Sequence, residues 1–443
     1  MVSLLAKYGN MVTIDTLKEY GGLYLLGIII RICIITSVFQ KTIADRVEVS
    51  TPLNSWKRII EALYLKDLDI YPYTGDLLHE LPLNLKLWDI LYFFCKDYIY
   101  LIFIVCDAAT AYLLYLFAKK HLSDMMNREN RGKEFYADNM KSVLINEKDC
   151  LVVPKYVAAA YLFNPYTICN CVGLTSTVFV NFSLAIFLNG LVNKSLVIST
   201  LFLANCISQN LYFILLLSPM ILQFLLIENQ TKKAFHSLIL VVIFWCVSVY
   251  LSYSIYKSWD FLSSTYGFTL TAPDLRPNIG LFWYFFTEVF EQFKELFLYS
   301  FQINILLVYL VPLSIRLRNE TMLLTLCLLL LIAVFKPYPC IGDVGFVLSI
   351  LPCWKYLFPY TQQGFTVAGT FCVATALAPT FWYLWLYSGS ANANFYFGVT
   401  LAFGSAQVFL LTDILFAYIK REFDLVHGMG IILEETFGSF RLQ

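Results

Sequence analysis

Apolar stretches long enough to cross a membrane recur along almost the whole chain, and they limit the possible folds more than any other feature. A spanning helix needs roughly 20 mostly apolar residues, and hydropathy marks about twelve such stretches. The sequence therefore predicts an all-α, polytopic membrane protein in which residues 1–443 form a single integral membrane domain. The predicted spans lie near residues 22–39, 91–118, 153–169, 174–192, 196–211, 212–228, 234–256, 296–315, 320–336, 343–358, 365–388 and 394–418.

The composition supports a membrane protein and argues against several functions. Hydrophobic residues make up 59% of the 443 residues and charged residues 14%, whereas soluble domains carry about 25% charged residues. Basic and acidic residues both number 31, so there is no net positive charge to attract nucleic acid. The 4 histidines are isolated and none of the 12 cysteines forms a CxxC pair, so we predict no metal site and no cofactor.

The positions of the basic residues predict the orientation in the membrane. Compact basic groups such as Lys119/Lys120, Lys232/Lys233 and Lys420/Arg421 all fall on one side if the N-terminus is cytosolic. The positive-inside rule favours this orientation, and an even number of spans then places both termini in the cytosol. The main connecting segments are a luminal loop at 41–89 with short amphipathic helices, a cytosolic loop at 119–152, and a luminal loop with an interfacial helix at 257–294.

The segment 257–294 combines a turn-rich loop with a run of aromatic residues. Pro273, Pro277 and Gly280 break any helix in its first half. From Leu281 to Phe293, aromatic residues recur at helical spacing with carboxylates between them, which predicts one helix. Such a helix suits the membrane surface or the mouth of a lipid cavity, although a simple interfacial anchor explains the pattern equally well.

Four ionisable residues fall inside the first two predicted spans. Arg31 lies in the first span, and Lys96, Asp97 and Asp107 lie in the second. Charges at membrane depth are costly unless they pair or line a wet cavity. We expect Arg31 to pair with Asp107, and a structural pair that fixes helix packing is favoured over a functional one.

Two carboxylates in the first luminal loop provide the clearest catalytic alternative. Asp67 and Asp69 form a DxD pattern, and a glycosyltransferase that uses lipid-linked sugars places carboxylates in a luminal loop, as base or metal ligand. The same spacing is common in ordinary loops, which is the favoured interpretation. The sequence contains no GxSxG, HExxH or P-loop motif, so we predict no catalytic residue.

Two asparagines precede the last predicted span. Asn392 and Asn394 lie in the segment SGSANANF, and their amides can donate to and accept from sugar hydroxyls and phosphate oxygens without carrying charge. The competing interpretation is a helix cap, which Asn favours and which needs only one of the two.

Several long segments, found in order along nearly the whole chain, resemble one known family. They include RVEVSTPLNSWKR at 46–58, YPYTGDLLHELPL at 71–83, FKPYPCIGDV at 335–344 and GSANANFYF at 389–397. The sequence is similar to subunit U of the glycosylphosphatidylinositol (GPI) transamidase, the phosphatidylinositol-glycan class U family.

This resemblance implies a non-catalytic subunit of a five-protein complex in the endoplasmic reticulum membrane. The complex cleaves a C-terminal signal from a precursor protein and joins the new C-terminus to the ethanolamine phosphate of GPI. A separate subunit carries the catalytic Cys and His. The implied partners are the other GPI transamidase subunits, the GPI lipid and membrane phospholipid. The implied fold is similar to that of the GT-C glycosyltransferases.

The resemblance also suggests roles for a few residues. Asn392 and Asn394 match the family's SAN-x-N turn and are expected to contact the GPI glycan or phosphate. Phe282, Trp283 and Phe286 are expected to line the acyl-chain side of the GPI site. Lys232 and Lys233 are expected to meet phospholipid headgroups at the cytosolic face. A lipid-linked, mannosyltransferase-like enzyme that uses Asp67 and Asp69 is the alternative.

Overall fold

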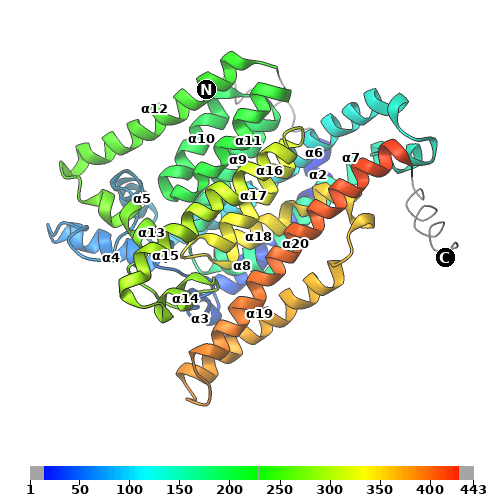
Figure 1. Cartoon of the computed structure of the whole chain (residues 1–443). Helices are drawn as coiled ribbons and strands as arrows, with labels where there is room; N and C mark the ends of the chain where they lie inside the picture. The colour runs from blue at the N-terminus through cyan, green and yellow to red at the C-terminus, as the bar shows by residue number, and fades with distance from the viewer. Residues whose placement is uncertain (1–13, 228, 429–443) are drawn as a thin grey trace.

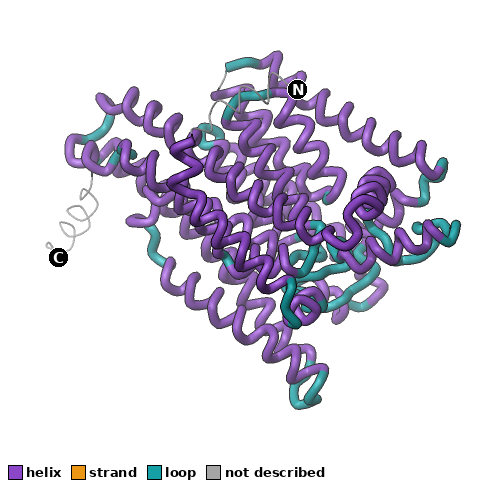
Figure 2. The backbone as a smooth tube through the Cα atoms, turned by 180° about the vertical axis from the view of Figure 1, so that it is seen from behind, coloured by secondary structure: helices purple, strands orange, loops and turns teal. Residues whose placement is uncertain are grey.

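The chain folds into an all-helical protein. The structure, a computed structural model, describes residues 14–227 and 229–428. Over these residues the backbone is built from helices and connecting loops, and the isolated bridge between Ser55 and Thr175 belongs to no strand (Figure 2). The all-α prediction is therefore confirmed for this part of the chain, whereas the predicted cytosolic ends at 1–13 and 429–443 lie outside the described residues.

Six helical segments of the described chain are long and apolar enough to cross a membrane. Further apolar helices such as α9 (Thr177–Val192), α10 (Leu196–Gln209) and α17 (Thr321–Phe335) are shorter, below the roughly 20 residues that a full span needs. The structure supports a membrane protein, but it does not confirm about twelve spans. The six candidate spans are Pro82–Phe135, Thr231–Tyr256, Glu291–Arg316, Ile341–Tyr360, Gly364–Leu386 and Ala393–His427.

Helix α17 lies at the centre of the molecule (Figure 1). Every residue from Thr321 to Val334 is buried, which explains why this helix is apolar on all sides. It packs against α11 (Leu217–Leu222), α18 (Ile341–Ile350) and α20 (Ala393–His427). Around this centre, α6 (Ile99–Gly132) packs extensively against α7 (Glu147–Phe163) and against α9. Helix α10 packs in the same way against α9 and against α12 (Thr231–Tyr256). Helices α19 (Gly364–Leu386) and α20 form a further closely packed pair.

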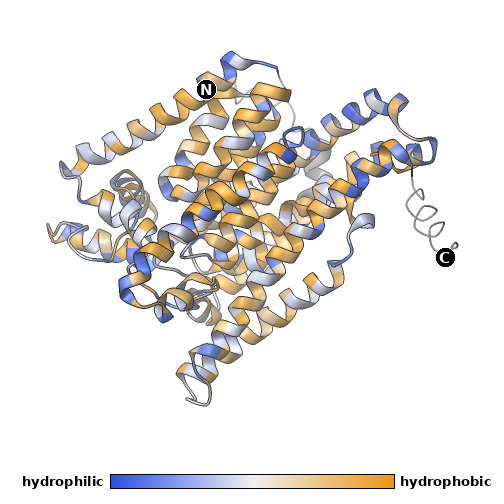
Figure 3. Ribbon diagram, in the orientation of Figure 1, coloured by the Kyte–Doolittle hydropathy of each residue, from blue (hydrophilic) through white to orange (hydrophobic). Residues whose placement is uncertain are grey.

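Apolar surface covers the outside of the bundle. Helix α12 and the segment Glu291–Arg316 bury only 11% of their most apolar windows, although their outward side chains are mostly aliphatic and aromatic. Figure 3 shows apolar residues along the middle of most helices, with polar residues gathered around α4 and α14 and around the end of α6. This division between an apolar middle and two polar ends fits a protein that sits in a bilayer.

Short helices fill the predicted luminal loop at 41–89. They are α3 (Phe39–Ala44), α4 (Trp56–Asp67) and α5 (Pro82–Cys95). Helix α4 is amphipathic, because it buries Trp56, Ile59 and Leu63 and exposes charged residues. The rings of Trp56 and Trp88 meet edge to face with centroids 5.3 Å apart, so this loop is a packed layer.

The predicted single helix from Leu281 to Phe293 is wrong. The structure has two helices, α14 (Phe282–Glu288) and α15 (Glu291–Asn304), separated by extended backbone at Val289 with ψ of 134°. A continuous helix would keep Phe290 on the same face as Phe282 and Phe286, because these positions are four residues apart. The break instead leaves Phe290 76% exposed, and it lets α15 continue into the span that ends at Arg316.

The expected pair between Arg31 and Asp107 is confirmed. Arg31 Nε donates to Asp107 Oδ2 at 2.5 Å, and both side chains are completely buried. Tyr161 donates to the other carboxylate oxygen at 2.8 Å, and Arg31 also donates to the carbonyl oxygen of Leu162 at 2.8 Å. The pair therefore joins α2 (Ile14–Ile35), α6 and α7.

Lys96 and Asp97 lie within the long candidate span Pro82–Phe135, at the joint between its two helices. Both residues are exposed in a short 3₁₀ turn, Lys96–Tyr98, between α5 and α6. The cytosolic loop predicted at 119–152 contains more helical structure than a simple connector. Helix α6 continues to Gly132, and short 3₁₀ turns follow it. The remaining helices are α8 (Pro165–Val172), α13 (Phe268–Thr271) and α16 (Val311–Arg316).

Candidate functional site

An apolar groove of about 850 Å³ lies between α19 and α20. Its walls include Phe365, Val373 and Phe381 from α19 and Phe395 and Val399 from α20. The polar side chains on its α20 side are two amides at the start of that helix, those of Asn392 and Asn394. The groove is thus mostly apolar, with two amides at one end and the threonines Thr366 and Thr370 on its α19 wall, and we call it the α19–α20 groove.

Asn392 caps the last helix. Its side-chain oxygen accepts a hydrogen bond from the backbone N–H of Asn394 at 3.1 Å, which satisfies one of the free N–H groups at the helix start. The cap interpretation is therefore confirmed for Asn392. Because the cap uses only the oxygen, the amide NH₂ of the exposed Asn392 side chain still points out as a donor.

Asn394 is held by a tyrosine that the sequence did not single out. The hydroxyl of Tyr284 in α14 donates to Asn394 Oδ1, and the Tyr284 ring stacks on Phe397 with centroids 4.4 Å apart. This contact directs the NH₂ group of Asn394 away from Tyr284. An aromatic residue among many gives no signal in the sequence, so only the structure could find this contact.

Phe282, Trp283 and Phe286 lie behind the groove. All three side chains are buried, between 2% and 4% exposed, and they are not among the groove-lining residues. The rings of Phe282 and Phe286 lie 4.2 Å apart, and the Trp283 ring packs on Tyr396 of α20 at 6.1 Å. The contact of Trp283 fastens α14 against α20, whereas Phe282 and Phe286 pack against Phe301 of α15. Their predicted role at an acyl chain stays a prediction.

Lys232 and Lys233 lie in the first turn of α12. Lys232 is exposed and Lys233 is half-buried. Positive charges at a helix N-terminus oppose the helix dipole, so helix stability does not explain this pair. The helix that follows presents mostly apolar side chains to its surroundings.

Asp67 and Asp69 lie away from the α19–α20 groove. Asp67 ends α4, and Asp69 follows in the left-handed conformation with φ of 55°. Both side chains are exposed, so they do not form an enclosed pair of carboxylates. Over residues 14–227 and 229–428, no group of three or more His, Cys, Asp or Glu side chains is placed to hold a metal ion.

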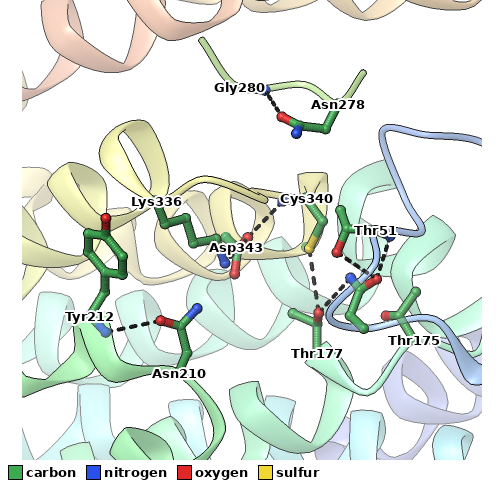
Figure 4. A network of polar contacts seen from close by, with 12 residues as sticks. Thr51, Thr175, Thr177, Asn210, Tyr212, Asn278, Gly280, Lys336, Cys340 and Asp343 are labelled. Atoms are coloured by element: carbon green, nitrogen blue, oxygen red, sulfur yellow. Dashed lines mark hydrogen bonds and ion pairs between the residues drawn. The ribbon is translucent and has the colours of Figure 1, made fainter. Parts of the chain in front are cut away.

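A buried ion pair borders a second, smaller cavity. Lys336 Nζ lies 2.6 Å from Asp343 Oδ2, with side-chain exposures of 8% and 12%. Asp343 also accepts from the backbone N–H of Cys340 at 2.9 Å, at the start of α18 (Figure 4). Neither Lys336 nor Asp343 was singled out from the sequence. Two opposite charges seven residues apart within an apolar region were the available signal.

Comparisons with known proteins identify the family. Residues 25–403 match the family model described as GPI transamidase subunit PIG-U. The GPI-anchor transamidase component PIGU of Homo sapiens is 35% identical over 422 residues, which cover 93% of this chain and 96% of that protein. The counterpart from Cricetulus griseus has the same identity and coverage.

A fungal relative is more distant but also extends over most of the chain. The GPI transamidase component GAB1 of Saccharomyces cerevisiae is 29% identical over 388 residues, which cover 87% of this chain and 90% of that protein. These relatives are named as transamidase components, and they give no support to the glycosyltransferase alternative at Asp67 and Asp69. The chain belongs to the family of GPI transamidase subunit PIG-U.

Proposed function

We propose that this chain is a non-catalytic subunit of a GPI transamidase complex in the endoplasmic reticulum membrane, and that its α19–α20 groove binds the GPI lipid. In this proposal the chain crosses the membrane about twelve times, as hydropathy suggests, with both ends cytosolic and a GT-C-like fold. Its partners are the other subunits of a five-protein complex, GPI and membrane phospholipid. The catalytic Cys and His lie on another chain.

The form of the groove carries this proposal. A ligand that is apolar along most of its length and polar at one end matches a groove of about 850 Å³ with two amides at its end. Ligand sites of this kind have volumes of about 300–1,000 Å³ and few polar groups, which set the orientation. An acyl chain of GPI would lie between α19 and α20, and the glycan or phosphate would reach the amides.

The hydrogen bonds of the two amides favour a ligand that accepts. The oxygen of Asn392 is occupied by the helix cap, and the oxygen of Asn394 is occupied by Tyr284. Both residues are therefore left with NH₂ groups, which donate to phosphate or hydroxyl oxygens. Trp283 supports this arrangement by holding α14, which carries Tyr284, against α20, and Phe282 and Phe286 pack the other side of α14 on Phe301 of α15.

Two further contributions complete the proposed role. Lys232 and Lys233 at the start of α12 would meet anionic phospholipid headgroups, each contributing about 1 kcal/mol of attraction near the surface. By holding GPI, the chain would place the ethanolamine amine close to the acyl intermediate formed on the catalytic subunit. This is a contribution of proximity, and it needs no acid or base from this chain.

The test uses cells in which a variant is the sole copy of this chain. We expect the double variant Asn392→Ala, Asn394→Ala to lower the amount of GPI-anchored protein at the cell surface, while complete GPI and unprocessed precursor accumulate. Flow cytometry measures the surface protein, mass spectrometry measures the lipids, and a pull-down checks that the complex is intact.

A matched variant separates ligand binding from helix capping. Asn392→Asp keeps a capping oxygen, because Asp and Asn cap equally well, but it removes the NH₂ donor. We expect Asn392→Asp to lower attachment as Asn392→Ala does. Full activity of Asn392→Asp would mean that this residue serves the cap only. Normal attachment in the double variant, or an under-mannosylated GPI intermediate, would contradict the proposal.

A further inference from the structure

Helix α19 forms one wall of the α19–α20 groove but buries little of its own surface. Only four of its 23 residues are buried: Val367, Phe371, Ala374 and Ala378. Pro379 lies inside the helix and has no N–H group, so the carbonyl group of Thr375, four residues earlier, receives no helical hydrogen bond. Apolar packing therefore fixes this wall less firmly than it fixes the central helix α17.

A buried carboxylate fixes the first end of α19. Asp413 of α20 is 5% exposed, and its two oxygens accept from the backbone N–H groups of Gln362 at 2.8 Å and of Gln363 at 3.0 Å. These N–H groups directly precede α19, which begins at Gly364. Asp413 forms no ion pair with another described residue, and a carboxylate in an apolar region is costly without partners. The two hydrogen bonds compensate for its burial while α19 keeps its place, so they tie the helix to α20.

A tyrosine of α8 holds the middle of the same helix. The Tyr166 hydroxyl lies 2.5 Å from Thr375 Oγ1, and Thr375 in turn donates to the carbonyl oxygen of Phe371 at 2.6 Å. Because a hydroxyl group has a single proton, Tyr166 is the donor in the first bond. Tyr166 is itself fixed, since it is 7% exposed and its ring packs on Phe403 of α20 with centroids 6.0 Å apart. The contact meets α19 four residues before Pro379, at the point that the proline weakens.

Both contacts act on the wall that lines the groove. The lining residues of α19 run from Phe365 to Phe381. Asp413 holds the backbone shortly before the first of them, and Tyr166 holds the residue that follows the lining residue Ala374. Neither Asp413 nor Tyr166 is itself a lining residue, so each acts on a ligand through the position of α19.

We propose that Asp413 and Tyr166 are positioning residues that hold the α19–α20 groove in its binding shape before a lipid arrives. This inference rests on the proposed function of the groove. A site that is formed in advance binds more tightly, because the ligand does not have to order it. When one of the two contacts is lost, a smaller fraction of the molecules has the binding shape, and the ligand level needed for half-occupancy rises by the same factor.

The first measurement needs no ligand. Hydrogen–deuterium exchange of the purified full-length chain in nanodiscs measures how often the backbone of residues 362–386 opens. We expect Tyr166→Phe to speed this exchange roughly threefold, which is the average effect of one side-chain hydrogen bond between membrane helices. Asp413→Asn should speed it roughly tenfold, because hydrogen bonds to a charged group are stronger.

The second measurement is the dependence of attachment on the supply of GPI. It uses cells in which a variant is the sole copy of this chain and in which GPI synthesis is regulated, with GPI measured by mass spectrometry. We expect both variants to raise the GPI level at half-maximal attachment by about the same factors, while maximal attachment and the amount of intact complex stay unchanged. A lower maximum at an unchanged half-maximal level would show a merely structural role and would overturn the proposal.

Two further variants serve as controls. Thr380→Val removes a hydroxyl that donates to the carbonyl oxygen of Ala376 within α19 at 3.0 Å, and it should change neither measurement. Thr375→Val removes the same contact between helices as Tyr166→Phe. The double variant Tyr166→Phe, Thr375→Val should therefore have no larger effect than one single variant, because both changes break one bond.

The outcomes separate this inference from the proposed function. Unchanged exchange in both Tyr166→Phe and Asp413→Asn would overturn the assignment of the two contacts. Faster exchange with an unchanged GPI dependence would overturn their role in lipid binding if the variant Asn392→Ala, Asn394→Ala still lowers attachment. If that variant also has no effect, the proposed function of the groove is wrong, and this inference falls with it.

Discussion

Replacing Asp107 by Asn tests how the buried charges hold the bundle together. In the native protein Arg31 and Asp107 are both 0% exposed and 2.5 Å apart. The variant keeps the size of the side chain but leaves the guanidinium group buried without its counter-charge. Removing one partner of a buried pair costs about 3–5 kcal/mol. Since whole domains are stable by only about 5–15 kcal/mol, this loss is a large share of the total.

The measurement is thermal unfolding of the purified full-length chain in detergent, followed by size-exclusion chromatography. We expect Asp107→Asn to lower the unfolding midpoint strongly. Asp97→Asn removes an exposed carboxylate, and its effect should stay within about 0.5 kcal/mol. The double variant Arg31→Met, Asp107→Leu should recover much of the loss, because well-packed apolar residues often replace a buried pair without cost.

The result that would refute this reasoning is an Asp107→Asn variant as stable as Asp97→Asn. It would mean that water or the remaining carbonyl contacts of Arg31 compensate for the lost charge. An Arg31→Met, Asp107→Leu variant that loses the sum of the two single effects would also count against a coupled pair, since residues in direct contact normally couple by about 0.5–3 kcal/mol.

Two further predictions concern packing and pH. Gly342→Ala should destabilise the chain by about 1–3 kcal/mol, because an added Cβ would lie 2.3 Å from the Asn170 side chain. Gly22→Ala, where nothing lies within 4 Å, should cost nothing in the same unfolding assay. Burial lowers the pKa of His79 from 6.5 to about 4, so the folded protein keeps this ring neutral while the unfolded chain protonates it near 6.5. The contribution of the neutral His79 ring to the free energy of unfolding is therefore fully present above pH 6.5. It falls as the pH drops towards 4, and about 2 kcal/mol is lost between pH 7 and pH 5. His79→Phe, which keeps the stacking on Phe268, should flatten this pH dependence, and an unchanged slope would show that another group is responsible.

The sequence predicted those features that follow from strong local rules. Arg31 and Asp107 had to find partners because both lie in apolar surroundings, and Asn392 had the residue type and position of a helix cap. The all-helical class followed from the length and hydropathy of the apolar stretches.

Other features depend on contacts between distant segments, which one sequence does not show. The break after α14 was missed because the aromatic spacing continues through Val289, although packing turns Phe290 outward. The smaller cavity beside Lys336 and Asp343 was missed because Gln209 and Lys336 come from separate elements and are brought together only by the fold. The contact of Tyr284 with Asn394 likewise joins α14 to α20.

The walls of the α19–α20 groove have a consequence for how a ligand reaches it. All the groove-lining residues come from α19 and from the segment 392–402, so two neighbouring helices form the site without a covering lid from the described chain. In the proposed binding mode, a lipid slides into the groove sideways from its own leaflet while its headgroup stays in water. Occupancy then follows the mole fraction of the lipid in the membrane plane, and dilution with other lipids or detergent empties the site even when the amount of ligand per volume is unchanged.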